Sequence, residues 1–130
     1  MTPVGRRTLA VGAVLGLLGV AAGAFGAHGL RGSVSARDLE IWQTGAHYQQ
    51  LHAVLLVAMG LTMRSPSRAL AVAAVLLTLG VLVFSGTLYA MVLGAPRVLG
   101  AVTPLGGLCL MTGWASLGAY ALVQRREPDA

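Results

Sequence analysis

The segment FGAHGLRGSVSARDLEIWQTGAHYQQLH, residues 25–52, lies between two apolar stretches and contains all three histidines of the chain. Its middle is a polar connection, and its second half carries aromatic, histidine and glutamine side chains in close succession. Almost everything that follows is uncharged and hydrophobic. The specific chemistry of the protein is therefore expected in this segment, and the apolar stretches around it decide the fold class.

The composition is that of a membrane protein. Of the 130 residues, 56% are hydrophobic and 10% are charged, against roughly 25% charged in an average soluble domain. The apolar residues form long blocks without charges, as they do when lipid is the solvent. All basic residues are arginines, and no polar face interleaves them with aromatic residues, which argues against nucleic-acid binding. A single membrane domain, residues 1–130, is expected.

The apolar blocks are long enough for four membrane-spanning helices, because about 20 residues rising ~1.5 Å each cross a hydrocarbon core of about 30 Å. Gly94–Arg97 is expected to form a tight turn before the last block. Pro104 lacks the amide that would bond to Gly100, so it should kink or unwind the first turns of the last helix. The predicted spans are 8–27, 46–63, 69–93 and 98–123.

Glycines mark one face of the first span. They are spaced by 4, 3, 4 and 3 residues, which places them on one stripe of a helix. Such a stripe lets another helix approach closely inside a bundle. An alternative is a cleaved signal peptide, because Arg6 and Arg7 precede an apolar run that reaches Ala22-Gly23-Ala24, but a discarded peptide has no use for the stripe. The predicted packing residues are Gly12, Gly16, Gly19, Gly23 and Gly26.

The connection after the first span predicts a short helix along the membrane interface. Ser35 and Asp38 fit a helix N-terminus, where the serine caps a free amide and the carboxylate faces the positive end of the helix dipole. Leu39 and Trp42 fall on one face, and the tryptophan suits the aromatic belt of a membrane. Gly45 is then the expected bend between this interfacial helix and the second span.

The placement of arginines predicts the orientation. With four spans, both termini and the connection between spans two and three share one side, which carries six arginines against three on the other. Because cytoplasmic flanks are enriched in basic residues, both termini are expected in the cytoplasm. The six are Arg6, Arg7, Arg64, Arg68, Arg125 and Arg126.

This topology brings polar residues of several spans to one depth, in the outer half of the bundle. They form a candidate ligand pocket, although polar side chains in bundles also bond between helices without further function. Haem or a metal ion would require His28 to pair with His52 or His47, because His47 and His52 diverge on one helix. No metal or cofactor is assigned. The candidate pocket consists of His28, Tyr48, Gln49, His52, Ser85, Tyr89 and Thr103.

Short motifs occur in order along the chain. They read GAFGAHGL (23–30), WQTGAHYQQLH (42–52), FSGTLY (84–89) and TPLGG (103–107), the last followed by Gly113-Trp114. In sequence and spacing they resemble the YgdD/YwdK family of small bacterial inner-membrane proteins. The resemblance covers nearly the whole chain and implies a four-span inner-membrane protein with an uncleaved first helix. It implies no activity, because that family is one of unknown function.

No nucleophile–base pair, phosphate-binding loop or intramembrane carboxylate is recognisable in the sequence, which argues against an enzyme or a pump. The sequence predicts an all-α integral membrane four-helix bundle with a short interfacial helix between spans one and two. Its expected role is that of a non-enzymatic component that binds a partner, a lipid or a small ligand in the polar pocket. The alternatives are a transporter or channel subunit, acting as a homo-oligomer or with a membrane protein partner, and a haem- or metal-binding protein.

Overall fold

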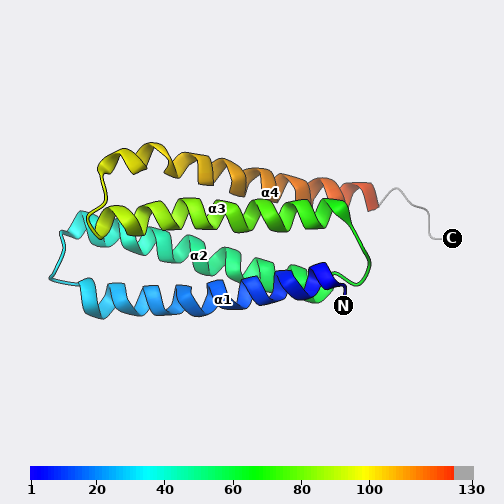
Figure 1. The fold of residues 1–130 in the computed structure, drawn as a ribbon, viewed down its shortest axis with the longest axis horizontal. Helices are drawn as coiled ribbons and strands as arrows, with labels where there is room; N and C mark the ends of the chain where they lie inside the picture. Colours follow the sequence, from blue (N-terminus) through cyan, green and yellow to red (C-terminus); the bar gives the residue numbers. More distant parts are fainter. Residues whose placement is uncertain (125–130) are drawn as a thin grey trace.

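The computed structural model describes residues 1–124 and is built of helices (Figure 1). The prediction of an all-α fold is confirmed, and the described residues contain no strand. A π-helical turn, Gly26–Leu30, extends the first helix, and a 3₁₀ turn, Arg97–Ala101, precedes the last one. The α-helices are α1 (Pro3–Phe25), α2 (Ala36–Thr62), α3 (Arg68–Val92) and α4 (Thr103–Gln124).

Side chains and glycines fix the ends of these helices. Ser35 caps α2 by accepting a hydrogen bond of 3.1 Å from the amide of Asp38, as expected from the sequence. Pro104 lies in the first turn of α4, where a missing amide costs no helical hydrogen bond, and the irregular backbone is confined to the 3₁₀ turn before it. Gly32 and Gly94 have φ angles of 82° and 109°, which glycine adopts without strain, so each allows a sharp turn between helices.

The helix α2 differs from the prediction. It is unbroken over Ala36–Thr62, so the predicted interfacial helix is its N-terminal part and not a separate element. The reason is packing, because a single buried stripe at helical spacing follows the helix from Trp42 to Leu56. Gly45 belongs to this stripe and is not a bend. A Cβ atom there would lie 2.9 Å from Cε1 of Tyr89, so the glycine permits close contact with α3.

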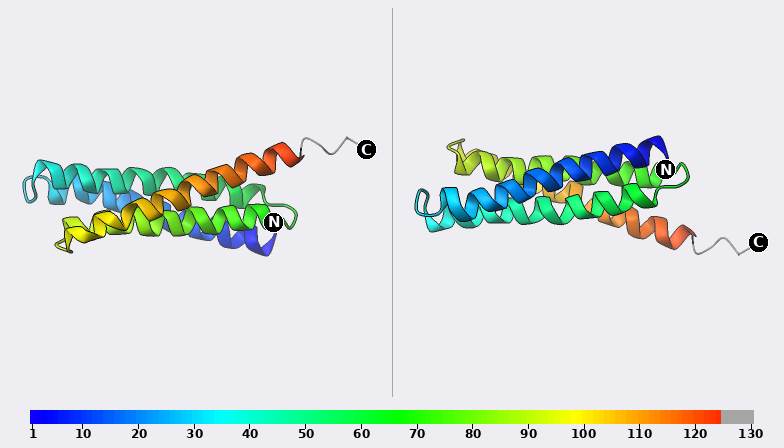
Figure 2. Two further views of the ribbon diagram at one scale, coloured as in Figure 1. Left: turned by 90° about the horizontal axis from the view of Figure 1, so that it is seen from above. Right: turned by 90° about the horizontal axis from the view of Figure 1, so that it is seen from below.

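Helices that follow each other in the chain run antiparallel and pack side by side. α1 lies along α2, α2 along α3, and α3 along α4, as Figure 1 and Figure 2 show. α1 meets α3 only briefly, and no Cα pair of α1 and α4 lies within 8 Å. The fold therefore consists of two helical hairpins, α1/α2 and α3/α4, which are joined along α2 and α3.

Glycines form the interface inside the first hairpin. The predicted stripe of α1 lies against α2, and a Cβ atom at Gly12 would stand 2.8 Å from the amide nitrogen of Val57. Gly60 of α2 faces α1 in the same way, 2.5 Å from the amide nitrogen of Leu9. These are backbone atoms, so the two helices could not accept larger residues without moving apart. Cβ atoms at Gly16, Gly19, Gly23 and Gly26 would meet side chains of α2 at 3.7, 2.9, 2.9 and 2.7 Å.

A second glycine interface closes the hairpin of α3 and α4. A Cβ atom at Gly106 would lie 2.5 Å from the amide nitrogen of Phe84, and one at Gly80 would lie 2.6 Å from Cδ2 of Leu110. Gly113 contacts a leucine of α3 in the same way. Both hairpins thus depend on the absence of side chains where their helices cross, which is a common way for membrane helices to associate.

The helices have the length and surface expected of a membrane protein. Three segments, Pro3–Leu30, Arg68–Val92 and Arg97–Gln124, are long and apolar enough to cross a bilayer. α2 is comparable in length, but glutamines and histidines lower its mean hydropathy. Of these polar side chains, Gln49 and His52 are buried inside the protein. The prediction of an α-helical membrane bundle is confirmed, and the four-span count remains a prediction.

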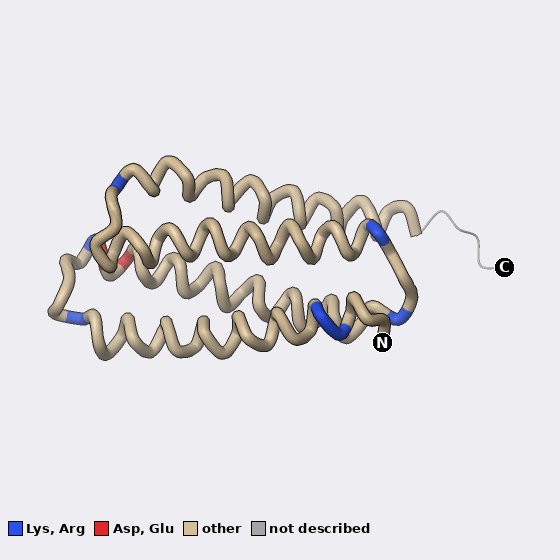
Figure 3. The backbone as a smooth tube through the Cα atoms, in the orientation of Figure 1, with Lys and Arg blue, Asp and Glu red and all other residues tan. Residues whose placement is uncertain are grey.

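Charged residues gather at the two ends of the bundle (Figure 3). At one end, Arg97 forms a 2.8 Å ion pair with Asp38, which ties the turn before α4 to the start of α2. The other end contains the N-terminus and the turn between α2 and α3. Arg125 and Arg126, which entered the predicted orientation, lie outside the described residues, and cytoplasmic termini remain a prediction. The described arginines at the N-terminal end are Arg6, Arg7, Arg64 and Arg68.

Candidate functional site

Gln49 connects three helices. Its side chain is 5% exposed, and its Nε2 donates a 2.9 Å hydrogen bond to the carbonyl oxygen of Leu15 in α1. Its Oε1 accepts a 2.7 Å hydrogen bond from the hydroxyl of Tyr89 in α3. Both ends of the amide are used, as a buried polar group requires. These bonds fix the rotation of α2 against its two neighbours.

The side chains around Gln49 also bond between helices, each to a backbone carbonyl of the neighbouring helix. A groove of about 290 Å³ remains between α1, α2 and α3, and Trp42, Gln49, Ser85 and Tyr89 form its polar lining. The rings of Trp42 and Tyr89 pack with their centroids 4.5 Å apart. The bonds run from Trp42 Nε1 to Ala22 (2.8 Å), from Gln50 Nε2 to Gly19 (2.7 Å) and from Ser85 Oγ to Gly45 (2.7 Å).

A second groove, of about 430 Å³, lies between α2, α3 and α4 and is lined by rings. The ring of Tyr48 packs on Phe84 with centroids 4.4 Å apart, and it is nearly parallel to the imidazole of His52 at 6.0 Å. Trp114 of α4 completes the group, with its Nε1 3.1 Å from Nε2 of His52. This site is called the aromatic groove below, and its rings are those of His47, Tyr48, His52, Phe84 and Trp114.

The partners of His52 determine where its proton lies. The indole N–H of Trp114 can only donate, so Nε2 of His52 accepts. The carbonyl oxygen of Tyr48 lies 2.7 Å from Nδ1 and can only accept, so Nδ1 carries the proton. His52 is therefore neutral, in its Nδ1–H tautomer. Its Nε2 lone pair, which a metal ion or haem iron would need, is already engaged by Trp114.

Nitrogen NMR of histidine-labelled protein in detergent micelles is expected to show this tautomer. The ¹⁵N chemical shifts should identify a protonated Nδ1 and an unprotonated Nε2 for His52, because its two neighbours leave no other donor–acceptor pattern. The variant His52→Gln assigns the signal by its disappearance. A proton on Nε2 would contradict the bond from Trp114 and the arrangement of the aromatic groove.

The remaining pocket residues of the sequence prediction lie apart from these groups. His28 is exposed on the π-helical turn and makes no side-chain hydrogen bond with the described residues. Thr103 shares a 2.7 Å hydrogen bond with Thr87, which holds the start of α4 against α3. No cluster of three or more histidine, cysteine, aspartate or glutamate side chains exists in the described part of the chain. The structure thus distributes the seven residues over two grooves, an interhelical bond and an exposed turn.

Sequence reasoning did not assign Phe84 and Trp114 to a site. Both residues belong to motifs of the sequence, but an aromatic residue in an apolar segment is usually a packing residue. The available signal was the indole N–H of Trp114, because a tryptophan inside a membrane bundle normally finds an acceptor. The rotation of α4 decides that this acceptor is His52, and the sequence does not give that rotation.

Comparison with known proteins places the chain in a family. Residues 22–107 match the family described as Protein of unknown function (DUF423). A UPF0382 membrane protein of Staphylococcus haemolyticus is 41% identical over 82% of this chain and 88% of its own length. The UPF0382 membrane protein YwdK of Bacillus subtilis is 38% identical over 86% of this chain and 93% of its own length. No solved structure matches the chain. The chain therefore belongs to the DUF423 family and is a relative of the UPF0382 membrane proteins, which confirms the resemblance carried by its motifs.

Proposed function

We propose that the protein is a non-enzymatic membrane component that holds a small lipophilic ligand in the aromatic groove. The observation that carries this proposal is the convergence of five rings from three helices on one groove of about 430 Å³. Tyr48 and Trp114 remain 38% and 47% exposed, so part of each side chain is open to an incoming molecule. Rings of this kind stack on flat or branched apolar groups.

A small ligand suits this groove better than a partner helix. Close association of membrane helices relies on small residues that let backbones approach. The tightest glycines of this chain, such as Gly12, Gly60 and Gly106, face neighbouring helices of the same molecule. The walls of the aromatic groove are mostly rings and long aliphatic side chains, and Gly107 is the one small residue among its lining residues in the described part of the chain.

The other functions considered from the sequence find less support. A bis-histidine haem would need His28 and His52, but His28 lies on the exposed π-helical turn and His52 is hydrogen-bonded through both ring nitrogens. An ion or proton path would need polar groups available to the transported species. Each buried side-chain polar atom in the described residues has a hydrogen-bond partner.

The proposal is tested on protein purified in mild detergent, extracted with organic solvent and examined by mass spectrometry. Wild type is expected to release one lipophilic compound in near-stoichiometric amount. Tyr48→Ala should retain about tenfold less, as the loss of roughly 1.4 kcal/mol of ring contact would produce. Tyr48 is 38% exposed and its hydroxyl makes no hydrogen bond with the described residues, so the bundle is expected to fold, and circular dichroism of the variant checks this.

Tyr120→Ala is the matched control, because Tyr120 lies on α4 outside the aromatic groove. It should retain the compound as wild type does. Absence of any bound compound in wild type, or equal loss in both variants, would refute the proposal. Metal content and a visible absorption spectrum of the same samples complete the test, since a haem band or stoichiometric metal would make this a cofactor protein instead.

A further inference from the structure

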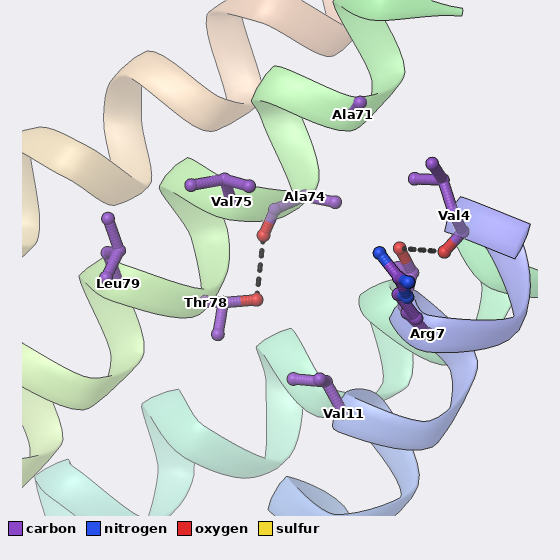
Figure 4. Close-up of a pocket in the computed structure, with 9 residues that line it drawn as sticks. Val4, Arg7, Val11, Ala71, Ala74, Val75, Thr78 and Leu79 are labelled. Carbon is purple, nitrogen blue, oxygen red and sulfur yellow. Dashed lines mark hydrogen bonds between the residues drawn. The ribbon is translucent and has the colours of Figure 1, made fainter. Parts of the chain in front are cut away.

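A third groove lies between α1 and α3, nearer the N-terminal end of the bundle (Figure 4). Its volume is about 390 Å³. Its walls extend from Val4 to Val11 on α1 and from Ala71 to Leu79 on α3, a length of roughly 10–12 Å at ~1.5 Å per residue. The groove exists because α1 and α3 approach each other only briefly, each being packed on α2.

The walls of this groove present mainly apolar groups, because its threonine hydroxyls are already hydrogen-bonded. Besides valine, alanine and leucine, two threonines line it, but both hydroxyls bond within their own helices. Thr8 donates to the carbonyl oxygen of Val4 at 2.9 Å, and Thr78 donates to that of Ala74 at 2.7 Å. Their methyl groups are what remains for an occupant. A hydrocarbon chain would fit this lining without leaving a polar group unpaired.

Arg7 is the charged side chain among the lining residues that the structure describes. It is exposed and forms no ion pair or side-chain hydrogen bond with the described residues. Arg6, Arg64 and Arg68 lie at the same end, whereas both described acidic residues lie at the opposite end (Figure 3). The groove therefore combines apolar walls with nearby positive charge. Such pockets in membrane proteins attract anionic lipid head groups.

We propose that this groove binds an anionic phospholipid, with an acyl chain along α1 and α3 and the phosphate beside Arg7. The apolar walls of the groove match the acyl chain of such a lipid, and Arg7 matches its phosphate. Arg7 lies near the end of α1, the level at which lipid head groups meet membrane helices. A second copy of the chain is a poor occupant, because it would place its own arginines next to Arg7 and the other arginines at this end of the bundle. The proposal involves different residues from the aromatic groove and does not rest on a ligand there.

Native mass spectrometry of the protein in mild detergent tests the phosphate contact. With phosphatidylglycerol and phosphatidylcholine of identical acyl chains, wild type is expected to bind one phosphatidylglycerol about fivefold more tightly, which corresponds to one arginine acting on one anionic head group. Arg7→Gln should abolish this preference. Arg64→Gln removes the same charge from the same end, outside the groove, and should keep it. Equal binding of both lipids to wild type, or equal effects of the two variants, would overturn the proposal.

A second pair of variants tests the acyl chain contact. Ala71→Phe fills the groove with a ring and should reduce binding of both lipids at least tenfold. Ala10→Phe makes the same change on an exposed face of α1 that does not line this groove and should bind as wild type. Circular dichroism confirms that each variant is folded. Wild-type binding by folded Ala71→Phe would place the lipid elsewhere and refute the assignment.

Discussion

Gly106→Ala is expected to destabilise the protein by about 1–3 kcal/mol, because adding a methyl group to a closely packed interface costs about that much. The added Cβ would lie 2.5 Å from the amide nitrogen of Phe84 and 2.9 Å from the carbonyl oxygen of Gly80. Both are backbone atoms of α3, so no side chain can rotate away and the helices must separate. The measurement is the free energy of unfolding in micelles, from chemical denaturation followed by circular dichroism.

Gly118→Ala, on the same helix, is the matched control. A Cβ atom at Gly118 meets nothing within 4 Å, and alanine favours a helix over glycine by up to about 1 kcal/mol. The two variants should therefore change the unfolding free energy in opposite directions. A loss of the same size in both would show that α3 and α4 do not cross at Gly106.

Gln49→Leu is expected to lower the unfolding free energy by about 1–2 kcal/mol. This range covers the loss of a hydrogen bond between membrane helices and the cost of leaving its former partner without one. The substitution keeps much of the side-chain volume but removes the bonds to Leu15 and Tyr89. Gln43→Leu makes the same change on the exposed face of α2 and should alter stability by less than about 0.5 kcal/mol. The same denaturation experiment measures both.

A double-mutant cycle with Tyr89→Phe isolates the bond between the Gln49 amide and the Tyr89 hydroxyl. Once Gln49 is replaced, the hydroxyl has lost this acceptor, so removing it should cost less than in wild type. The double variant is then expected to lose less stability than the sum of the two single variants. Strictly additive losses would mean that the two side chains do not interact in the membrane protein.

α1, α3 and α4 were predictable because each is a long apolar block. The glycine stripe of α1 was predictable because five glycines of one helix repeat at helical spacing. The α3/α4 interface was not predictable in this way. Its glycines are divided between two helices, with Gly80 on one and Gly106 and Gly113 on the other. The prediction of a bend at Gly45 was wrong for a related reason. Sequence alone does not distinguish a glycine that permits close contact between helices from one that permits a bend.

The candidate site was predictable in composition but not in arrangement. Sequence spacing brings polar residues of several helices to one depth, yet Tyr48 and Gln49 are neighbours in the chain and point about 100° apart on a helix. Gln49 consequently faces α1 and α3, whereas Tyr48 lines the aromatic groove with α4. Which side each takes depends on the rotation of α2, and this is set by tertiary contacts.

The hydrogen bonds between α2 and α1 bear on how the chain enters the membrane. A helix with several unpaired side-chain amide and indole groups is poorly accommodated by hydrocarbon, because buried polar groups without partners cost free energy. α1 is long and apolar enough to cross a bilayer, and it is synthesised before α2. We expect α1 to supply hydrogen-bond acceptors to α2, and in this way to help the less hydrophobic α2 enter the membrane beside it. The acceptors it offers are the carbonyl oxygens of Leu15, Gly19 and Ala22.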